Sequence, residues 1–269
     1  MYPYAWRRRE WRPERARLAR APPAGAGSVT GLPFLAWGAP LVEARFASRP
    51  NRFLVRARVT GGADVEAHLA DPGRLKELLV PGRRMGLRPE TPSPKRRTHW
   101  TAVLVESPDG EEWVSLDTTV PNRLVRAALA ERALSELRPW ELVGREVPFG
   151  KSRLDFLLQD PGGRRMYVEA KSVTLVRDDV ALFPDAVTAR GTRHLEELVR
   201  ARQEGHEAAV LFVLQRRDAH RIVAARAIDP DFADALARAA GEGVHVLGRR
   251  CSVGWEGIRL GGRVPVAVG

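Results

Sequence analysis

The clearest alternation of apolar and polar positions along the chain lies in its second half. Ser152–Leu158 and Met166–Lys171 both alternate as β-strands do. The segment between them contains Asp160–Gly163, whose proline and glycine residues are typical of a tight turn. The pattern therefore predicts a β-hairpin over residues 152–171.

This hairpin brings charged side chains together. Side chains two residues apart on a strand point to the same face, so Glu169 and Lys171 share one face. Asp160 and Arg164 are expected to pair beside the turn. That register places Asp155 opposite Glu169, with Cβ atoms roughly 5 Å apart, a distance at which two carboxylates repel and a divalent cation relieves the repulsion. In the alternative interpretation, Asp155 caps a turn and Glu169 forms only a weak ion pair with Lys171.

The rest of the second half alternates between amphipathic helices and apolar strands. The spacing predicts helices over 122–137, 190–204 and 230–240, and strands over 207–215 and 244–247. Residues 208–214 are apolar at every position, as a strand buried on both faces requires. The outward face of the helix over 190–204 is expected to include Arg193, His194, Glu197 and Arg200. The order helix, three strands, helix, strand, helix, strand predicts an α/β/α sandwich around a mixed sheet.

The first half shows short strands separated by turns. Strands are predicted over 41–46, 53–59, 64–69, 85–88, 101–106 and 112–116. A short helix is expected to begin at Asp71, with Pro72 at its first position and its apolar face formed by Leu75, Leu78 and Leu79. About five strands and one helix suit a small β-barrel of the oligonucleotide-binding (OB) kind, although an SH3-like barrel or a meander gives nearly the same pattern.

The patterns together predict an α+β protein of two domains. Residues 37–118 are expected to form the OB-like barrel, and residues 119–269 the mixed-sheet domain. Residues 1–36 are rich in arginine and lack periodicity, so we expect a basic, disordered or loosely packed extension there.

Composition narrows the class of protein. The longest apolar run, residues 208–214, is too short to cross a bilayer, and no membrane partner is expected. The single cysteine, Cys251, excludes an internal disulfide framework and fits the reducing cytoplasm. The net charge of +11 favours a polyanionic partner, which is most often DNA or RNA. The oligomeric state is not fixed by these features, and they are compatible with a dimer.

Positive charge is unevenly distributed. Seven arginines lie within residues 1–20, and a second basic cluster lies within residues 83–97. Only Lys76, Lys95, Lys151 and Lys171 are lysines, so the chain places one of its few lysines beside Glu169. Lysine is a compact charge whose pKa shifts readily on burial, whereas arginine is bulky and permanently protonated.

Six strings of residues are distinctive. They are Arg49–Phe53, His68–Gly82, Ser152–Phe156, Tyr167–Leu175, Phe183–Leu195 and Phe212–Arg216. On these strings the chain resembles the sugar fermentation stimulation protein family, from about residue 40 to residue 260. The resemblance implies an amino-terminal OB barrel and a carboxy-terminal domain similar to the PD-(D/E)XK nucleases.

The resemblance also implies roles for particular residues. Asp155 and Glu169 match the metal-binding carboxylates, and Lys171 matches the catalytic lysine. A carboxylate from the preceding helix often completes such sites, and Glu131 is the candidate here. Gln215, at the end of the central strand, is expected to reach the same cleft. The expected metal is Mg²⁺ or Mn²⁺.

Basic residues in both domains are candidates for binding nucleic acid. Those expected to contact phosphates are Arg52, Arg74, Arg153, Arg190, Arg193 and His194. Phe53 and Trp100 are candidates for base stacking, although a core position is favoured for Phe53.

Three functions are compatible with these features. The first is a sequence-tolerant DNA-binding protein that regulates sugar catabolism, as the family name implies. The second is a metal-dependent nuclease acting on DNA or RNA. The third is a barrel that binds a small molecule or peptide. A steep loss of affinity with salt distinguishes the first two from the third.

Overall fold

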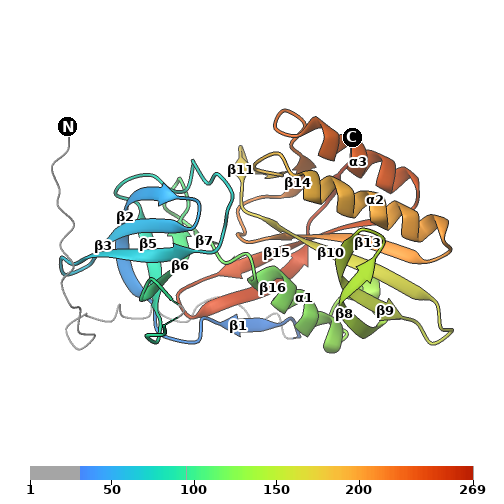
Figure 1. The fold of residues 1–269 in the computed structure, drawn as a ribbon, viewed down its shortest axis with the longest axis horizontal. Coiled ribbons are helices and arrows are strands. Elements are labelled where there is room, and N and C mark those ends of the chain that lie inside the picture. Colours follow the sequence, from blue (N-terminus) through green and yellow to red (C-terminus); the bar gives the residue numbers. More distant parts are fainter. Residues whose placement is uncertain (1–30, 95, 269) are drawn as a thin grey trace.

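The computed structural model describes residues 31–94 and 96–268, which form two β-rich domains side by side (Figure 1). The predicted extension lies mostly outside the described residues, as do the seven arginines within residues 1–20. None of the helices in the described part of the chain is long and apolar enough to span a bilayer.

The first domain is a closed barrel. Its strands are β2 (Val42–Asn51), β3 (Leu54–Val59), β4 (Asp64–Leu69), β5 (Arg84–Pro89), β6 (Trp100–Glu106) and β7 (Trp113–Ser115). They follow the order β4-β3-β2-β5-β6-β7, and an additional parallel pairing of β4 with β6 closes the sheet. A meander leaves its edge strands unpaired, so this closure excludes the meander.

The helix expected after Asp71 does not form. Residues 71–82 are a loop in which Leu75 has a positive φ of 48°, and the amides of Leu78 and Leu79 both bond the Leu75 carbonyl in a single turn. The Asp71 carboxylate accepts a hydrogen bond from Gly73 N at 2.8 Å, a local bond that competes with helix formation. The three leucines are nevertheless buried in the barrel core.

The second domain is built on a seven-stranded mixed sheet with the order β1-β16-β15-β13-β10-β9-β8. Its strands are β1 (Phe34–Ala36), β8 (Glu141–Phe149), β9 (Ser152–Gln159), β10 (Arg165–Val173), β13 (Glu207–Leu214), β15 (His245–Val253) and β16 (Gly257–Arg263). A small second sheet contains β11 (Val176–Arg177), β12 (Val180–Phe183), β14 (Arg221–Ala224) and β17 (Val266–Ala267). Strand β13 is parallel to both of its neighbours and buried on both faces, as its apolar sequence predicts.

Helices cover both faces of the large sheet (Figure 1). Helix α1 (Val120–Ala130) packs on one face, and α2 (Ala189–Gln203) and α3 (Pro230–Gly241) pack on the other. This arrangement confirms the α/β/α sandwich. The helix expected over 122–137 is shorter, because α1 ends at Ala130 and only a 3₁₀ turn, Ser135–Leu137, follows.

The segment before the barrel belongs to the second domain. Strand β1 pairs antiparallel with β16, and Trp37 Nε1 donates a hydrogen bond to Gly254 O at 2.8 Å. The expectation of loose packing throughout the extension was therefore wrong for Phe34–Ala36. Three residues carry too little periodicity to reveal a strand whose partner lies more than 200 residues away.

The two domains share buried apolar residues. Leu41 and Leu104 of the barrel belong to the same cluster as Leu124 of α1. Trp113 of β7 packs edge-to-face on Trp255, with ring centroids 5.2 Å apart. A shared core of this kind holds the domains in one orientation.

Hydrogen bonds form a second connection between the domains. Asp185, which follows β12, accepts a hydrogen bond from Arg74 N at 2.8 Å. Asp71 lies beside it and is 6% exposed. Burial raises the pKa of Asp71 to about 6, and the negative charge of Asp185 adds to this rise.

This shift predicts how stability depends on pH. A carboxyl with a raised pKa in the folded state stabilises the fold at low pH, and this contribution is lost as the pH rises through about 6. Asp71→Asn keeps an acceptor for Gly73 N and removes the buried charge. We expect its free energy of unfolding to exceed that of the wild type by about 2 to 3 kcal/mol at pH 8 and to match it near pH 4. Urea unfolding at several pH values measures the difference; parallel curves for the two proteins would contradict this account.

Candidate active site

The β9–β10 hairpin has the predicted register. Asp160 N donates to Arg164 O at 3.0 Å, and the Asp160 carboxylate accepts Arg164 N at 2.9 Å. The ladder then runs from the Gln159–Arg165 pair to the Phe156–Val168 pair. The next residue on each strand is a carboxylate, Asp155 on β9 and Glu169 on β10.

Asp155 lies where this ladder ends. Its Oδ2 accepts a hydrogen bond from Ala170 N at 2.8 Å, and its Oδ1 accepts one from Asn122 Nδ2 of α1 at 2.7 Å. Burial raises the pKa of Asp155 to about 6, and the negative charge of Glu169 contributes to the rise. Asn122 was not among the predicted site residues, although its spacing of three from the buried Val125 places it on the inward side of α1.

Glu169 and Lys171 form a buried pair on the face covered by α2. Their exposed fractions are 4% and 8%, and Lys171 Nζ donates to Glu169 Oε1 at 2.8 Å. Although burial opposes it, the hydrogen bond from His194 and the charge of Lys171 hold the pKa of Glu169 below its usual range. The other oxygen, Glu169 Oε2, is buried and has no hydrogen-bond partner among the described residues. A buried carboxylate oxygen without a donor is suited to a cation.

His194 orients Glu169. Arg190 Nε donates to His194 Nε2 at 3.3 Å, so the ring proton lies on Nδ1, which contacts Glu169 Oε1. The imidazole is 3% exposed. The assignment of His194 to phosphate contact was therefore wrong: the side chain supports the carboxylate instead. His194 follows Arg190 by four residues on α2, a spacing that places two side chains side by side on a helix. This spacing is the sequence signal for their contact.

Two predicted site residues do not join this cluster. Glu131 is exposed at the C-terminal end of α1, whereas Asn122, which contacts Asp155, lies in the first turn. Nine residues of helix separate them, which is roughly 13 Å. Gln215 is fully buried, and its Nε2 donates to Ser172 Oγ at 2.8 Å. It therefore supports β10, and its burial is at odds with the predicted contact with nucleic acid.

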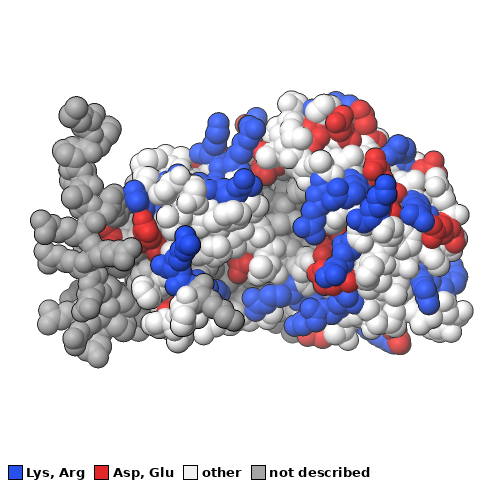
Figure 2. All heavy atoms as spheres, in the orientation of Figure 1, with Lys and Arg blue, Asp and Glu red and all other residues white. Residues whose placement is uncertain are grey.

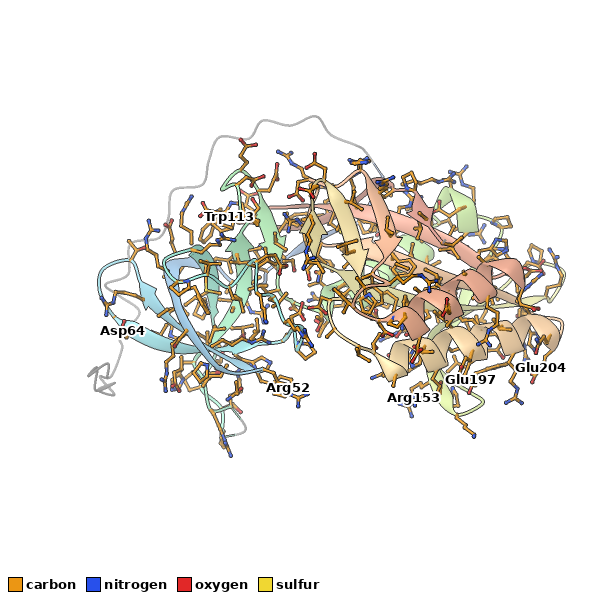
Figure 3. The ribbon with its side chains drawn as sticks, turned by 90° about the horizontal axis from the view of Figure 1, so that it is seen from above. Arg52, Asp64, Trp113, Arg153, Glu197 and Glu204 are labelled. Carbon is orange, nitrogen blue, oxygen red and sulfur yellow. The ribbon has the colours of Figure 1, made fainter. Side chains whose placement is uncertain are left out.

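The remaining basic candidates are exposed. Arg153 lies on β9, Arg193 lies with Arg190 on α2, and Arg52 and Arg74 lie on the barrel. Figure 2 shows Lys and Arg side chains gathered over the second domain near α2 and on the barrel, with carboxylates between them. Viewed from above, Arg52 and Arg153 lie on the same side of the molecule, one on each domain (Figure 3).

The structure reverses both expectations about aromatic residues. Phe53, for which a core position was favoured, is 50% exposed. Trp100, a candidate for stacking, is 3% exposed and packs in the barrel core. Phe53 directly precedes β3 at a hairpin tip, and Trp100 begins β6 inside the barrel. The sequence alone does not distinguish these two positions.

Glu197 holds the turn between β8 and β9. It is 7% exposed rather than outward, and its Oε1 accepts a hydrogen bond from Lys151 N at 2.7 Å. Gly150 has a positive φ of 54°, and a Cβ there would collide with the Glu197 carboxylate. This contact fixes the turn from which β9 runs towards Asp155.

Gly150→Ala is expected to lower the free energy of unfolding by about 2 to 3 kcal/mol, because it combines an unfavourable backbone conformation with displacement of the Glu197 carboxylate. Gly205→Ala is the matched control. Gly205 also has a positive φ, of 85°, but nothing lies within 4 Å of its added Cβ. The control should lose about 1 kcal/mol in urea unfolding. Equal losses in the two variants would exclude a role for Glu197.

The chemistry of Asp155 and Glu169 is suited to a divalent cation. In the described part of the chain, no three His, Cys, Asp or Glu side chains form a ready-made metal centre. Mg²⁺ is commonly bound by one or two carboxylates together with water and substrate phosphate. Glu169 Oε2 has no donor among the described residues, and burial together with the negative charge of Glu169 raises the pKa of the neighbouring Asp155.

Comparison with known protein families gives two matches. The model described as "SfsA N-terminal OB domain" matches residues 48–116, and that described as "Sugar fermentation stimulation protein RE domain" matches residues 119–257. The two matches divide the chain near the predicted boundary. They fit the observed fold, an OB-like barrel followed by a mixed-sheet α/β/α domain.

Curated relatives and a solved structure extend these matches. A sugar fermentation stimulation protein homolog of Moorella thermoacetica is 46% identical over 213 residues, covering 79% of this chain and 90% of the homolog. A homolog of Chloroflexus aurantiacus is 47% identical over 232 residues, covering 86% and 88%. The structure of Pyrococcus furiosus SfsA in complex with Ca²⁺ superposes with a TM-score of 0.78 at 26% identity, covering 87% of this chain and 98% of that one.

Proposed function

The chain belongs to the sugar fermentation stimulation protein family, and on this basis we propose that it binds DNA and carries a divalent-metal-dependent phosphodiesterase site in its second domain. The proposed catalytic residues are Asp155, Glu169 and Lys171. Asp155 and Glu169 are the proposed metal ligands. A regulatory effect on sugar catabolism, which the family name implies, stays a prediction.

One observation carries the proposal. Glu169 offers a buried, unpartnered carboxylate oxygen on the residue that also holds the ammonium group of Lys171. A buried carboxylate oxygen without a donor among the described residues is uncommon, and it is suited to a cation. The complex of the Pyrococcus furiosus relative with Ca²⁺ further supports a divalent cation.

The chain's own residues would prepare the reaction. Asp155 and Glu169 would hold Mg²⁺ or Mn²⁺, which supplies Lewis acidity and lowers the pKa of a bound water. Lys171 is held in place by Glu169 Oε1, so its ammonium group can stabilise negative charge that develops on a phosphate. His194 keeps Glu169 Oε1 occupied and thereby leaves Oε2 available.

The net charge of the chain and its exposed arginines support a nucleic acid as the partner, and DNA is the one proposed here. The chain carries a net charge of +11, and Arg153 and Arg193 form no ion pair with any described residue. Such cations can contact phosphates without reading the sequence. This arrangement favours sequence-tolerant binding over the small-molecule or peptide barrel.

A cleavage assay tests the proposal. Single- and double-stranded DNA and RNA are incubated with the full-length protein in Mg²⁺, in Mn²⁺ and in chelator, and binding is measured in parallel at several salt concentrations. We expect cleavage of DNA that requires the metal, and binding that weakens steeply with salt. Cleavage that persists in chelator, or salt-independent binding, would contradict the proposal.

A further inference from the structure

Phe53 is an exposed aromatic side chain beside the tip of the β2–β3 hairpin. It is 50% exposed, and the guanidinium carbon of Arg52 lies 5.6 Å from the centroid of its ring. Asn51 Oδ1 accepts a hydrogen bond from Phe53 N at 2.9 Å, which fixes the backbone at this point. The ring is thus presented to solvent on a defined turn and beside a cation.

Arg49 makes this hairpin tip rigid. One guanidinium nitrogen, Nη1, donates to Gly73 O at 2.6 Å and Arg74 O at 3.0 Å. The other, Nη2, donates to Arg52 O at 2.9 Å and Asp71 O at 3.1 Å. A single side chain therefore joins the β2–β3 tip to the loop over residues 71–82, and it places the backbones of Arg52 and Arg74 close together.

Cations are exposed on the two segments that Arg49 joins, the β2–β3 tip and the loop over residues 71–82. Arg52, Arg74 and Lys76 are exposed, and none of them forms an ion pair with another described residue. Unpaired cations around an exposed ring match the two parts of a nucleotide, a phosphate and a flat base. They do not suit an apolar protein segment, which offers no anion.

The same loop is connected to the active-site helix. Arg74 N donates to Asp185 Oδ2, and Thr188, three residues further on, caps the N-terminus of α2 through a hydrogen bond from Gly191 N. Helix α2 carries His194, which contacts Glu169. The surface around Phe53 is therefore fixed relative to the site in the second domain, and Arg52 faces the same side as Arg153 (Figure 3).

We propose that Phe53, Arg52 and Arg74 form a binding site for single-stranded nucleic acid. An unpaired base stacks on Phe53, and the two arginines contact the flanking phosphates. Bases within a duplex are stacked on their neighbours and cannot offer a face to the ring, so the site selects unpaired nucleotides. The inference rests on the proposed function and specifies its substrate as a strand with unpaired bases near the cleavage site.

Fluorescence anisotropy with the full-length protein tests the inference. The probes are a labelled oligothymidine and the blunt duplex that it forms with oligoadenosine, both in chelator to prevent cleavage. Phe53→Ala is compared with Phe53→Trp and with Phe34→Ala. Phe34 is the matched control because it is 42% exposed and has Arg259 at 5.0 Å from its ring, but it lies on β1.

We expect Phe53→Ala to weaken binding of oligothymidine by about 10- to 100-fold and to leave duplex affinity within about two-fold, because phosphate contacts dominate duplex binding. Phe53→Trp should restore the affinity, and Phe34→Ala should not change it. Equal losses for both probes, or an unchanged affinity for oligothymidine, would overturn the inference while DNA binding itself stands. If the wild type binds neither probe, the proposed function fails first.

Discussion

Replacing Lys171 by methionine is expected to lower Mg²⁺-dependent cleavage by about 1,000-fold or more. Methionine has a similar length and no charge, so it removes the ammonium group that Glu169 Oε1 holds at 2.8 Å. DNA affinity should change by less than about two-fold, because the exposed arginines that would contact phosphates are untouched. Initial cleavage rates and binding, measured on the same DNA, separate the two effects.

Two controls accompany this variant. Circular dichroism and urea unfolding test whether Lys171→Met is folded. We expect it to fold, because Glu169 keeps its contact with His194. Lys171→Arg restores the charge in a bulkier group, and we expect it to recover little cleavage because the pair is buried. Cleavage by Lys171→Met at the rate of the wild type would refute the assigned role of Lys171.

Binding of a divalent cation is expected to stabilise the folded protein, and Glu169→Gln should abolish this effect. A ligand at 100 times its dissociation constant adds about 2.7 kcal/mol, which raises the Tm by roughly 5 °C for a chain of this size. Gln retains an acceptor oxygen for His194 but removes the negative charge that attracts the metal. Thermal melts with Mg²⁺, Mn²⁺ or chelator measure the shift.

Glu131→Gln is the matched control for this experiment. It makes the same chemical change at a carboxylate that the sequence analysis assigned to the site and that the structure places, exposed, at the other end of α1. Its metal-dependent shift in Tm should equal that of the wild type. A shift that survives in Glu169→Gln, or disappears in Glu131→Gln, would place the metal elsewhere.

The sequence alone predicts the framework of the site because that framework is local. The turn at Asp160–Gly163 fixes the hairpin register, and strict alternation then places Glu169 and Lys171 on one face. Residues 208–214 are apolar at every position and form the central strand. In each case a few neighbouring residues determine the outcome.

The features of the site that the sequence did not predict depend on contacts between residues far apart in the chain. His194 and Glu197 look like members of a solvated helix face, and they are buried because β10 and the β8–β9 turn supply partners for them. The helix expected after Asp71 does not form, because the Asp71 carboxylate accepts a hydrogen bond from Gly73 N instead. Glu131 was assigned to the site because of the helix face on which it lies. Its position at the C-terminal end of α1 places it away from Asp155.

The route of the chain between the domains affects how the protein can be divided. Strand β1 completes the sheet of the second domain, the chain then forms the barrel, and it re-enters the second domain at α1. A fragment starting at residue 119 would lack β1 and leave the backbone of β16 open to pairing with another copy. During synthesis on the ribosome, the barrel emerges complete, whereas β1 must wait for its partner strand near the end of the chain.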